Sequence, residues 1–140
     1  MKKLILVAAI FLVTGVMFGQ NLQKGMVLAV SSYELTLKDS VTFQQFVDFM
    51  QKKYVPEFEK SMPGVKLSLL FGDRGENKFK YGELLVFDDV KTRDKYFPTE
   101  SDTVDSPAMK VVNEKLKAVT DESGKYVLNT RRIYTDWIVK

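Results

Sequence analysis

The clearest pattern in the chain is a change from one continuous apolar run to segments in which apolar and polar residues alternate. Lys2 and Lys3 precede an almost unbroken apolar run over residues 4–18. A positive start followed by an apolar run of about 15 residues is typical of a secretory signal peptide. The run is too short for a membrane-spanning helix, which needs about 20 residues. We therefore expect a signal peptide over residues 1–19, cleaved before Gln20, with an uncleaved N-terminal anchor as the alternative.

Residues 20–140 are expected to form a single domain that begins with a strand and a long helix. Residues 26–35 are rich in apolar and β-branched residues, which predicts a strand covered on both faces. Thr42 and Gln45 have the spacing of a capping box, so a helix should begin there. Pro56 lacks an N–H group, so the helix should kink or restart there before it ends at residues 63–64. Its predicted apolar stripe consists of Phe43, Phe46, Val47, Met50 and Tyr54.

The next segments predict an antiparallel hairpin followed by a short helix. Apolar residues alternate with polar ones over residues 65–71, and residues 79–87 again have the composition of a strand. The polar, glycine-bearing residues 72–77 between them are typical of a hairpin turn. Asp88 or Asp89 can cap a short helix from Val90 to Tyr96, which Pro98 would end.

The last third of the chain predicts a second long helix and one or two strands. Ser106 can cap a helix that has Pro107 in its first position and Gly124 as its stop. Its apolar face would consist of Met109, Val112, Leu116 and Val119. A short strand is predicted over residues 126–128 and a final one over residues 133–139.

The predicted order β-α-β-β-α-β is that of a ferredoxin-like α+β domain, in which an antiparallel sheet carries its helices on one face. The other face then needs a cover, because a large exposed apolar patch is unusual in a monomer. We expect either a second copy of the chain or a bound ligand to shield it. The aromatic and apolar residues expected there, depending on strand register, include Tyr33, Tyr81, Leu85, Tyr134 and Trp137.

The order of elements also resembles that of a known superfamily. The long first helix followed by Pro63-Gly64-Val65, and the segment FDDVKTRDKYFP after the hairpin, resemble the dimeric α+β-barrel superfamily. That resemblance implies ferredoxin-like subunits paired through their sheets. It also implies relatives of several kinds: haem-degrading oxygenases, cofactor-free monooxygenases, NIPSNAP-like proteins and domains without known activity. A shared fold does not choose among these functions.

Composition argues against several kinds of chemistry and, among these relatives, against the haem-degrading oxygenases. The chain has no histidine and no cysteine, which argues against thiol nucleophiles, a Ser-His-Asp triad, an ordinary zinc site and haem held by an axial histidine. Without the lysines at positions 2 and 3, 19 Lys and Arg face 18 Asp and Glu, so the expected mature chain has a net charge of +1. That balance disfavours nucleic-acid binding, which needs clustered cations. We expect no cofactor and no metal.

The remaining chemistry lies in carboxylates, tyrosines and arginines. Glu83 interrupts an apolar strand, so it is either a buried acid or base with a raised pKa, or a residue of a solvated face paired with a lysine or Arg131. Strand alternation places Arg131 and Arg132 on opposite faces. The ligand-binding residues predicted from the sequence are Tyr33, Tyr81, Glu83, Arg131, Tyr134 and Trp137.

Three functions remain open on the sequence alone. The leading hypothesis is an exported, non-catalytic module that dimerises or binds a small apolar or anionic ligand. The second is a cofactor-independent monooxygenase or isomerase that uses Glu83 or a tyrosine as proton carrier. The third is an envelope protein that recognises a partner chain.

Overall fold

The computed structural model of the protein describes residues 21–99 and 106–140. The predicted signal peptide and its cleavage site therefore lie outside the described residues, as do residues 100–105 of the polar segment before the second long helix. Across the two described stretches, no helix is both long enough and apolar enough to span a membrane.

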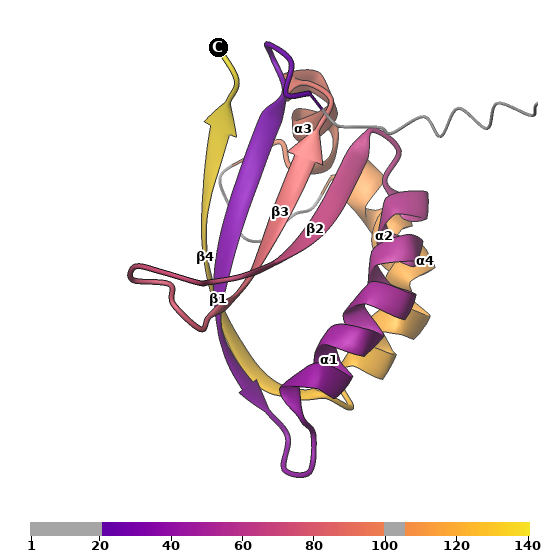
Figure 1. Ribbon diagram of the computed structural model, residues 1–140. Helices are drawn as coiled ribbons and strands as arrows, with labels where there is room; N and C mark the ends of the chain where they lie inside the picture. The colour runs from indigo at the N-terminus through magenta and orange to yellow at the C-terminus, as the bar shows by residue number, and fades with distance from the viewer. Residues whose placement is uncertain (1–20, 100–105) are drawn as a thin grey trace, which may run out of the picture.

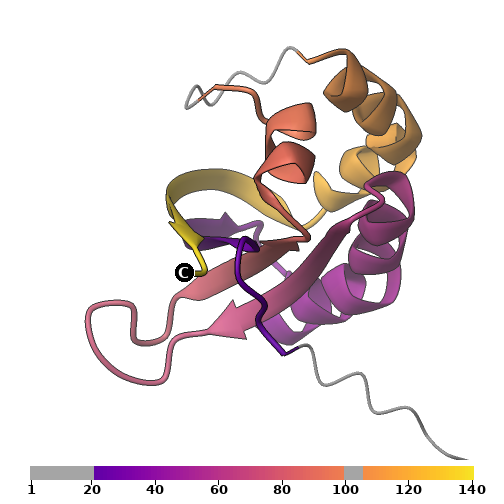
Figure 2. The same cartoon turned by 90° about the horizontal axis from the view of Figure 1, so that it is seen from above.

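Four strands and their connecting helices follow the predicted β-α-β-β-α-β order. The elements are β1 (Val27–Leu37), α1 (Phe43–Phe49), the π-helical turn η1 (Met50–Tyr54), α2 (Val55–Ser61), β2 (Val65–Phe71), β3 (Tyr81–Phe87), α3 (Val90–Tyr96), α4 (Pro107–Ser123) and β4 (Val127–Ile138). The strands form one sheet in the order β2-β3-β1-β4, with every neighbouring pair antiparallel. The helices lie on one side of this sheet (Figures 1 and 2). The ferredoxin-like α+β prediction is confirmed.

The first helix begins where the sequence predicts, and a new α-helical segment starts next to Pro56, as one of the two predicted outcomes. The hydroxyl of Thr42 accepts a hydrogen bond from the backbone N–H of Gln45 at 3.2 Å, and the Gln45 side chain accepts one from the backbone N–H of Thr42 at 2.8 Å. Phe46 and Met50 of the predicted stripe are buried, whereas Phe43 remains partly exposed. Because Pro56 cannot donate to the helical ladder, the turn before α2 widens into the π-helical η1.

The second long helix also matches its sequence signals. The hydroxyl of Ser106 accepts a hydrogen bond from the backbone N–H of Met109 at 3.0 Å and donates one to the carbonyl of Tyr96 at 2.9 Å. This cap therefore ties the start of α4 to the end of α3. All four predicted core residues of α4, namely Met109, Val112, Leu116 and Val119, are buried.

The C-terminal strand differs from its prediction. Instead of two short strands, β4 is continuous and pairs with β1 from Ile138, opposite Val27, to Val127, opposite Leu37. The polar residues 129–132 interrupt the apolar pattern, which is why the sequence suggests a break. The backbone of β1 nevertheless supplies hydrogen-bond partners along this stretch, so the strand continues whatever its side chains are.

The strand register corrects the predicted composition of the helix-free face. Val27 and Ala29 of β1 are buried under the helices, and every second residue of a strand shares one face. Tyr33 therefore points to the helix side. Through cross-strand pairing so do Tyr81, Leu85 and Tyr134, so the prediction that these side chains cover the helix-free face is wrong.

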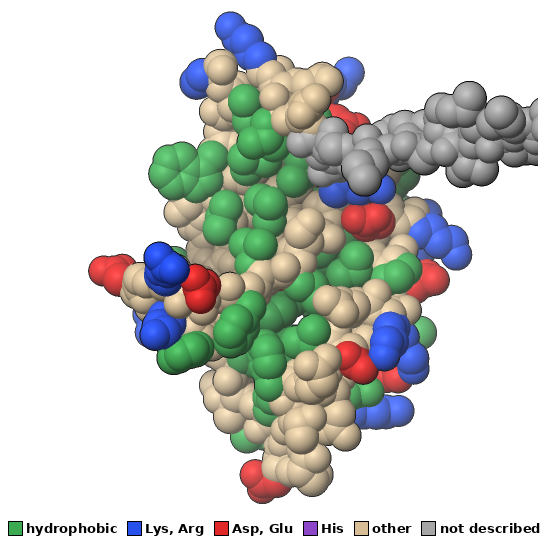
Figure 3. All heavy atoms as spheres, viewed as in Figure 1, with side chains coloured by type: hydrophobic (Ala, Val, Ile, Leu, Met, Phe, Trp, Pro, Cys, Tyr) green, Lys and Arg blue, Asp and Glu red, His purple; other side chains and the backbone are tan. Residues whose placement is uncertain are grey.

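Trp137 alone of the predicted group lies on the helix-free face, opposite Leu28. The other residues of this face are mostly aliphatic. We call the face formed by Leu28, Val30, Leu70, Leu84, Val86, Ile133 and Trp137 the open face. Figure 3 shows a band of hydrophobic side chains across this side of the molecule. A partner on this face would therefore make mainly aliphatic contacts.

Candidate functional site

A carboxylate held by two phenols occupies the helix side of the sheet. The hydroxyl of Tyr33 donates to one oxygen of Glu83 at 2.6 Å, and the hydroxyl of Tyr81 donates to the other at 2.7 Å. Tyr33 lies directly opposite Tyr81 in the β1–β3 register, and Glu83 is two residues further along β3. The pairing of two strands thus brings together residues 50 positions apart. We call Tyr33, Tyr81 and Glu83 the Tyr-Glu cluster.

Burial and the neighbouring carboxylate set the protonation of these tyrosines. Removal from water raises the pKa of Tyr33 and of Tyr81 well above the usual range, and the negative charge of Glu83 raises both further. Burial, and to a lesser extent the negative charge of Glu83, also raise the pKa of Tyr54 in η1 to about 12. All three phenols are therefore protonated near neutral pH, and two of them are held as donors to Glu83.

An arginine on β4 lies next to this cluster. The register places Arg132 opposite Tyr33, and its positive charge opposes the rise in the pKa of Tyr33. The Arg132 guanidinium lies 4.4 Å from the centre of the Tyr134 ring, a cation–π arrangement. Within residues 21–99 and 106–140, no carboxylate lies within 4.0 Å of this guanidinium. On the helix side of β4, the Arg132 guanidinium is therefore a cation without a carboxylate partner in these described residues.

Comparison with known proteins identifies the fold. No protein-family model and no curated protein matches the chain at a significant level. Among solved structures, a NIPSNAP family protein of unknown function from Agrobacterium tumefaciens aligns with a TM-score of 0.51 and 7% identity, covering 81% of this chain and 89% of that one. The chain therefore shares the fold of this NIPSNAP family protein.

Two further solved structures with this fold align less closely. A dimeric protein of unknown function from Bacteroides fragilis aligns with a TM-score of 0.42 and 14% identity, covering 82% of this chain and 97% of that one. SnoaB, a cofactor-independent oxygenase from Streptomyces nogalater, aligns with a TM-score of 0.43 and 14% identity, covering 83% and 94%. At such identities the likeness concerns the fold alone.

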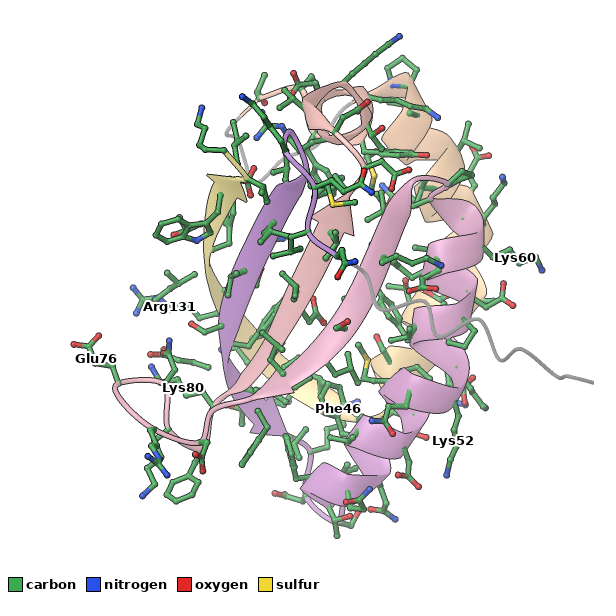
Figure 4. The ribbon with its side chains drawn as sticks, turned by 45° about the horizontal axis from the view of Figure 1, so that its top comes forward. Phe46, Lys52, Lys60, Glu76, Lys80 and Arg131 are labelled. Atoms are coloured by element: carbon green, nitrogen blue, oxygen red, sulfur yellow. The ribbon has the colours of Figure 1, made fainter. Side chains whose placement is uncertain are left out.

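In this ferredoxin-like fold, four of the six predicted ligand-binding residues lie on the helix side, close to one another: Tyr33, Tyr81, Glu83 and Tyr134. Arg131 and Trp137 do not join them. Arg131 lies on the other face, 3.9 Å from Glu34, and Figure 4 shows its side chain pointing away from the helices. Glu83 therefore has tyrosine partners, and the predicted pairing with a lysine or Arg131 is wrong.

Sequence reasoning missed Arg132 and Tyr54 as members of this region. The prediction of one arginine on each face is confirmed, and the arginine on the helix side is Arg132. A strand repeats every two residues, so Tyr134 shares its face with Arg132 and not with Arg131. That signal was available in the sequence. Tyr54 comes from the helical layer, and no local pattern connects it with β3.

The acidic residues after β3 have a structural role. The carboxylate of Asp89 accepts a hydrogen bond from the backbone N–H of Thr92 at 2.6 Å and caps α3. This bond lowers the pKa of Asp89, as expected for a carboxylate that caps a helix. In the part of the chain that the structure describes, no group of three Asp, Glu, His or Cys side chains is arranged to hold a metal ion.

A pocket of about 240 Å³ lies where β1 extends past the Tyr-Glu cluster. Two of its lining residues, Tyr33 and Tyr81, belong to that cluster. The others are Glu34, Leu35, Leu37, Phe43, Phe79 and Lys80. Figure 4 shows Lys80 at the base of the β2–β3 hairpin and Phe46 between α1 and the sheet. The fold thus offers two distinct features, the region around Arg132 and this pocket.

Proposed function

We propose that this protein is an exported, homodimeric module that binds a small anionic ligand without transforming it. The observation that carries the proposal is the juxtaposition of Arg132 with the Tyr-Glu cluster on the helix side of the sheet. A guanidinium without a carboxylate partner attracts a carboxylate or similar anion and can bind it through two N–H groups. The ring of Tyr134 offers an apolar surface beside it.

The Tyr-Glu cluster supports binding better than catalysis. Both oxygens of Glu83 already accept phenol hydrogen bonds. The raised pKa of Tyr33 and of Tyr81 keeps those phenols protonated, so neither can accept a proton from a substrate near neutral pH. A cofactor-independent oxygenase or isomerase remains the alternative, and in it Glu83 would have to exchange a phenol hydrogen bond for a substrate proton.

The binding proposal is tested with 4-hydroxybenzoate, a small aromatic carboxylate, by isothermal titration calorimetry. Replacing Arg132 with Gln should weaken binding about tenfold or more, since a charge-assisted hydrogen bond contributes about 1.5–3 kcal/mol. Arg131→Gln is the matched control, because it removes the same charge one residue away on the other face. Equal affinities for the two variants, or no binding by the unaltered protein, would overturn the proposal.

The open face supports homodimer formation. Val30, Leu70, Ile133 and Trp137 are 39%, 38%, 55% and 61% exposed, respectively, and share this face. Burying such a patch against a second copy is favourable at about 25 cal/mol per Å² of apolar surface. A different partner chain on this face, as in an envelope interaction protein, is the alternative, and it would leave the isolated protein monomeric.

Trp137→Asp is expected to dissociate the dimer, because it forces an unpaired charge into an apolar interface. Val111→Asp is the control, since Val111 is similarly exposed at 50% but lies on α4. Sedimentation velocity at micromolar concentration should show a dimer for the unaltered protein and the control, and a monomer for Trp137→Asp. An unaltered protein that sediments as a monomer would count against the pairing.

Export is proposed from the apolar run and the two lysines at the start of the chain. Cleavage before Gln20 would leave the mature domain without a membrane anchor, in the periplasm or outside the cell. Mass spectrometry of the protein recovered from the producing cells gives its N-terminal residue. An intact Met1 on membrane-bound protein would favour the uncleaved anchor instead.

A further inference from the structure

β1 continues past the end of β3 and has a free edge there. Its pairing with β3 ends where Tyr33 lies opposite Tyr81, whereas its pairing with β4 continues to Leu37. Beyond Tyr81 the hairpin turns away, and the carbonyl of Lys80 accepts a hydrogen bond from the backbone N–H of Gly72 at 3.0 Å. Figure 1 shows β1 and β4 running on together below the level at which the hairpin leaves the sheet.

The backbone groups of residues 34–37 that point away from β4 therefore have no strand partner within residues 21–99 and 106–140. Such groups in a strand alternate between N–H donors and C=O acceptors at a fixed spacing. Four residues span about 13 Å at about 3.3 Å each. The free edge is therefore long enough for a segment of four or five residues.

The pocket of about 240 Å³ lies along this edge. Leu35 and Leu37 of the edge contribute to it, and Phe43 and Phe79 add aromatic walls from α1 and the hairpin. Sites for whole small molecules usually measure about 300–1,000 Å³, so this volume suits a single large side chain better. An occupant that places one side chain here must keep the rest of its mass outside, along the strand.

The wall formed by Phe79 is held in a conformation that non-glycine residues rarely adopt. Phe79 has a φ of 66°, and its N–H donates to the carbonyl of Gly72 at 2.7 Å. Its ring lies 6.4 Å from that of Phe71 and is 71% exposed. A left-handed backbone at a bulky residue persists only where the surrounding structure fixes it. The hairpin thus holds an exposed aromatic ring beside the free edge.

The charges beside the pocket indicate which peptide would fit. The carboxylate of Glu34 already forms an ion pair with the Arg131 guanidinium, at 3.9 Å. Lys80 has no carboxylate within 4.0 Å in the described stretches of the chain. An acidic residue of an incoming segment would find its partner in Lys80.

We propose that residues 34–37 of β1 bind an extended peptide as an added strand, in the space left where β3 ends. Only a polypeptide in extended conformation supplies the alternating donors and acceptors that this edge requires, which is the principle of β-strand addition. One apolar side chain of the peptide occupies the pocket and an acidic residue two positions away lies beside Lys80. Arg132 does not line this site, although Tyr33 and Tyr81 do, and strand addition does not depend on the proposed anionic ligand.

The test uses a fluorescein-labelled, end-blocked peptide, Thr-Val-Phe-Thr-Glu-Thr, titrated with the full-length protein by fluorescence anisotropy. Phe and Glu stand two positions apart, so they point to the same side of a strand. Two further peptides carry N-methyl groups, one at the odd and one at the even positions. An added strand turns one set of N–H groups towards β1 and the other away from it.

Strand addition predicts that one N-methylated peptide loses binding about tenfold or more while the other binds like the parent, because only one set of N–H groups faces the edge. Equal binding by all three peptides, loss of binding by both N-methylated peptides, or no binding by the parent would overturn the proposal.

The charge is tested separately with Lys80→Gln. This change should weaken binding of the Glu-containing peptide several-fold and leave unchanged a peptide in which Gln replaces that Glu. Lys78→Gln is the matched control, because the Lys78 ammonium lies over the Phe79 ring at 4.8 Å and Lys78 does not line the pocket. Equal effects of the two substitutions would refute the role of Lys80.

Discussion

The Tyr-Glu cluster gives the sharpest prediction about stability. Tyr81→Phe removes the phenol that donates to one oxygen of Glu83 at 2.7 Å. It leaves the ring, which is 4% exposed and meets the Phe46 ring edge-on at 5.2 Å. Because the apolar contacts survive, the loss in free energy of unfolding reports the missing hydrogen bond together with the carboxylate oxygen that is left without a donor. A hydrogen bond to a charged group contributes about 1.5–3 kcal/mol, and we expect a loss in that range.

The measurement is urea unfolding followed by far-ultraviolet circular dichroism. Tyr126→Phe is the matched control, because the Tyr126 ring stacks on Phe49 at 4.7 Å while its hydroxyl has no hydrogen-bond partner in the described chain. This control should change stability by less than about 0.5 kcal/mol. If Tyr81→Phe is no more destabilising than Tyr126→Phe, the phenol does not hold the carboxylate as described.

A double-mutant cycle attributes the loss to the pair. Glu83→Gln keeps an acceptor oxygen but removes the charge, so Tyr81→Phe should cost less in that background. The difference between the two backgrounds is expected to be about 1 kcal/mol. If Tyr81→Phe lowers the free energy of unfolding equally in both backgrounds, its effect does not come from the contact with Glu83.

Two further predictions concern pH and the backbone. The pKa of Tyr54 is raised to about 12 in the folded protein, against about 10 in the unfolded chain. As the pH rises, this tyrosine therefore ionises first in the unfolded chain. The stability that it contributes is complete below about pH 10 and is lost as the pH rises through about 12. This prediction would be contradicted if the urea concentration at the unfolding midpoint did not decrease as the pH is raised above 10. Gly64 and Gly75 have φ values of 85° and 82°, but only at Gly64 would a Cβ meet a neighbour, the Thr92 methyl at 2.9 Å. Thermal unfolding should therefore show Gly64→Ala to be more destabilising than Gly75→Ala, by about 1–3 kcal/mol, and equal losses would refute the close approach.

Local signals in the sequence determined where most elements begin and end. The capping box at Thr42, the serine cap at position 106 and the missing N–H of Pro56 act within one or two helical turns. The positions at which these helices begin or change can therefore be predicted without knowledge of the rest of the molecule. Helical periodicity also identified the buried face of α4, because the stripe of one helix needs no knowledge of its neighbour.

Only the tertiary structure decided which side chains meet. Strand alternation says that Arg131 and Arg132 point in opposite directions, but which of them faces the helices depends on the register between β4 and β1. The same register moved Tyr33 and Tyr134 to the helix side and left Trp137 on the open face. Glu83 acquired its phenol partners because β1 pairs with β3, a contact between residues 50 positions apart that no local pattern encodes. The free edge at residues 34–37 likewise exists only because β3 ends earlier than β4 does along β1.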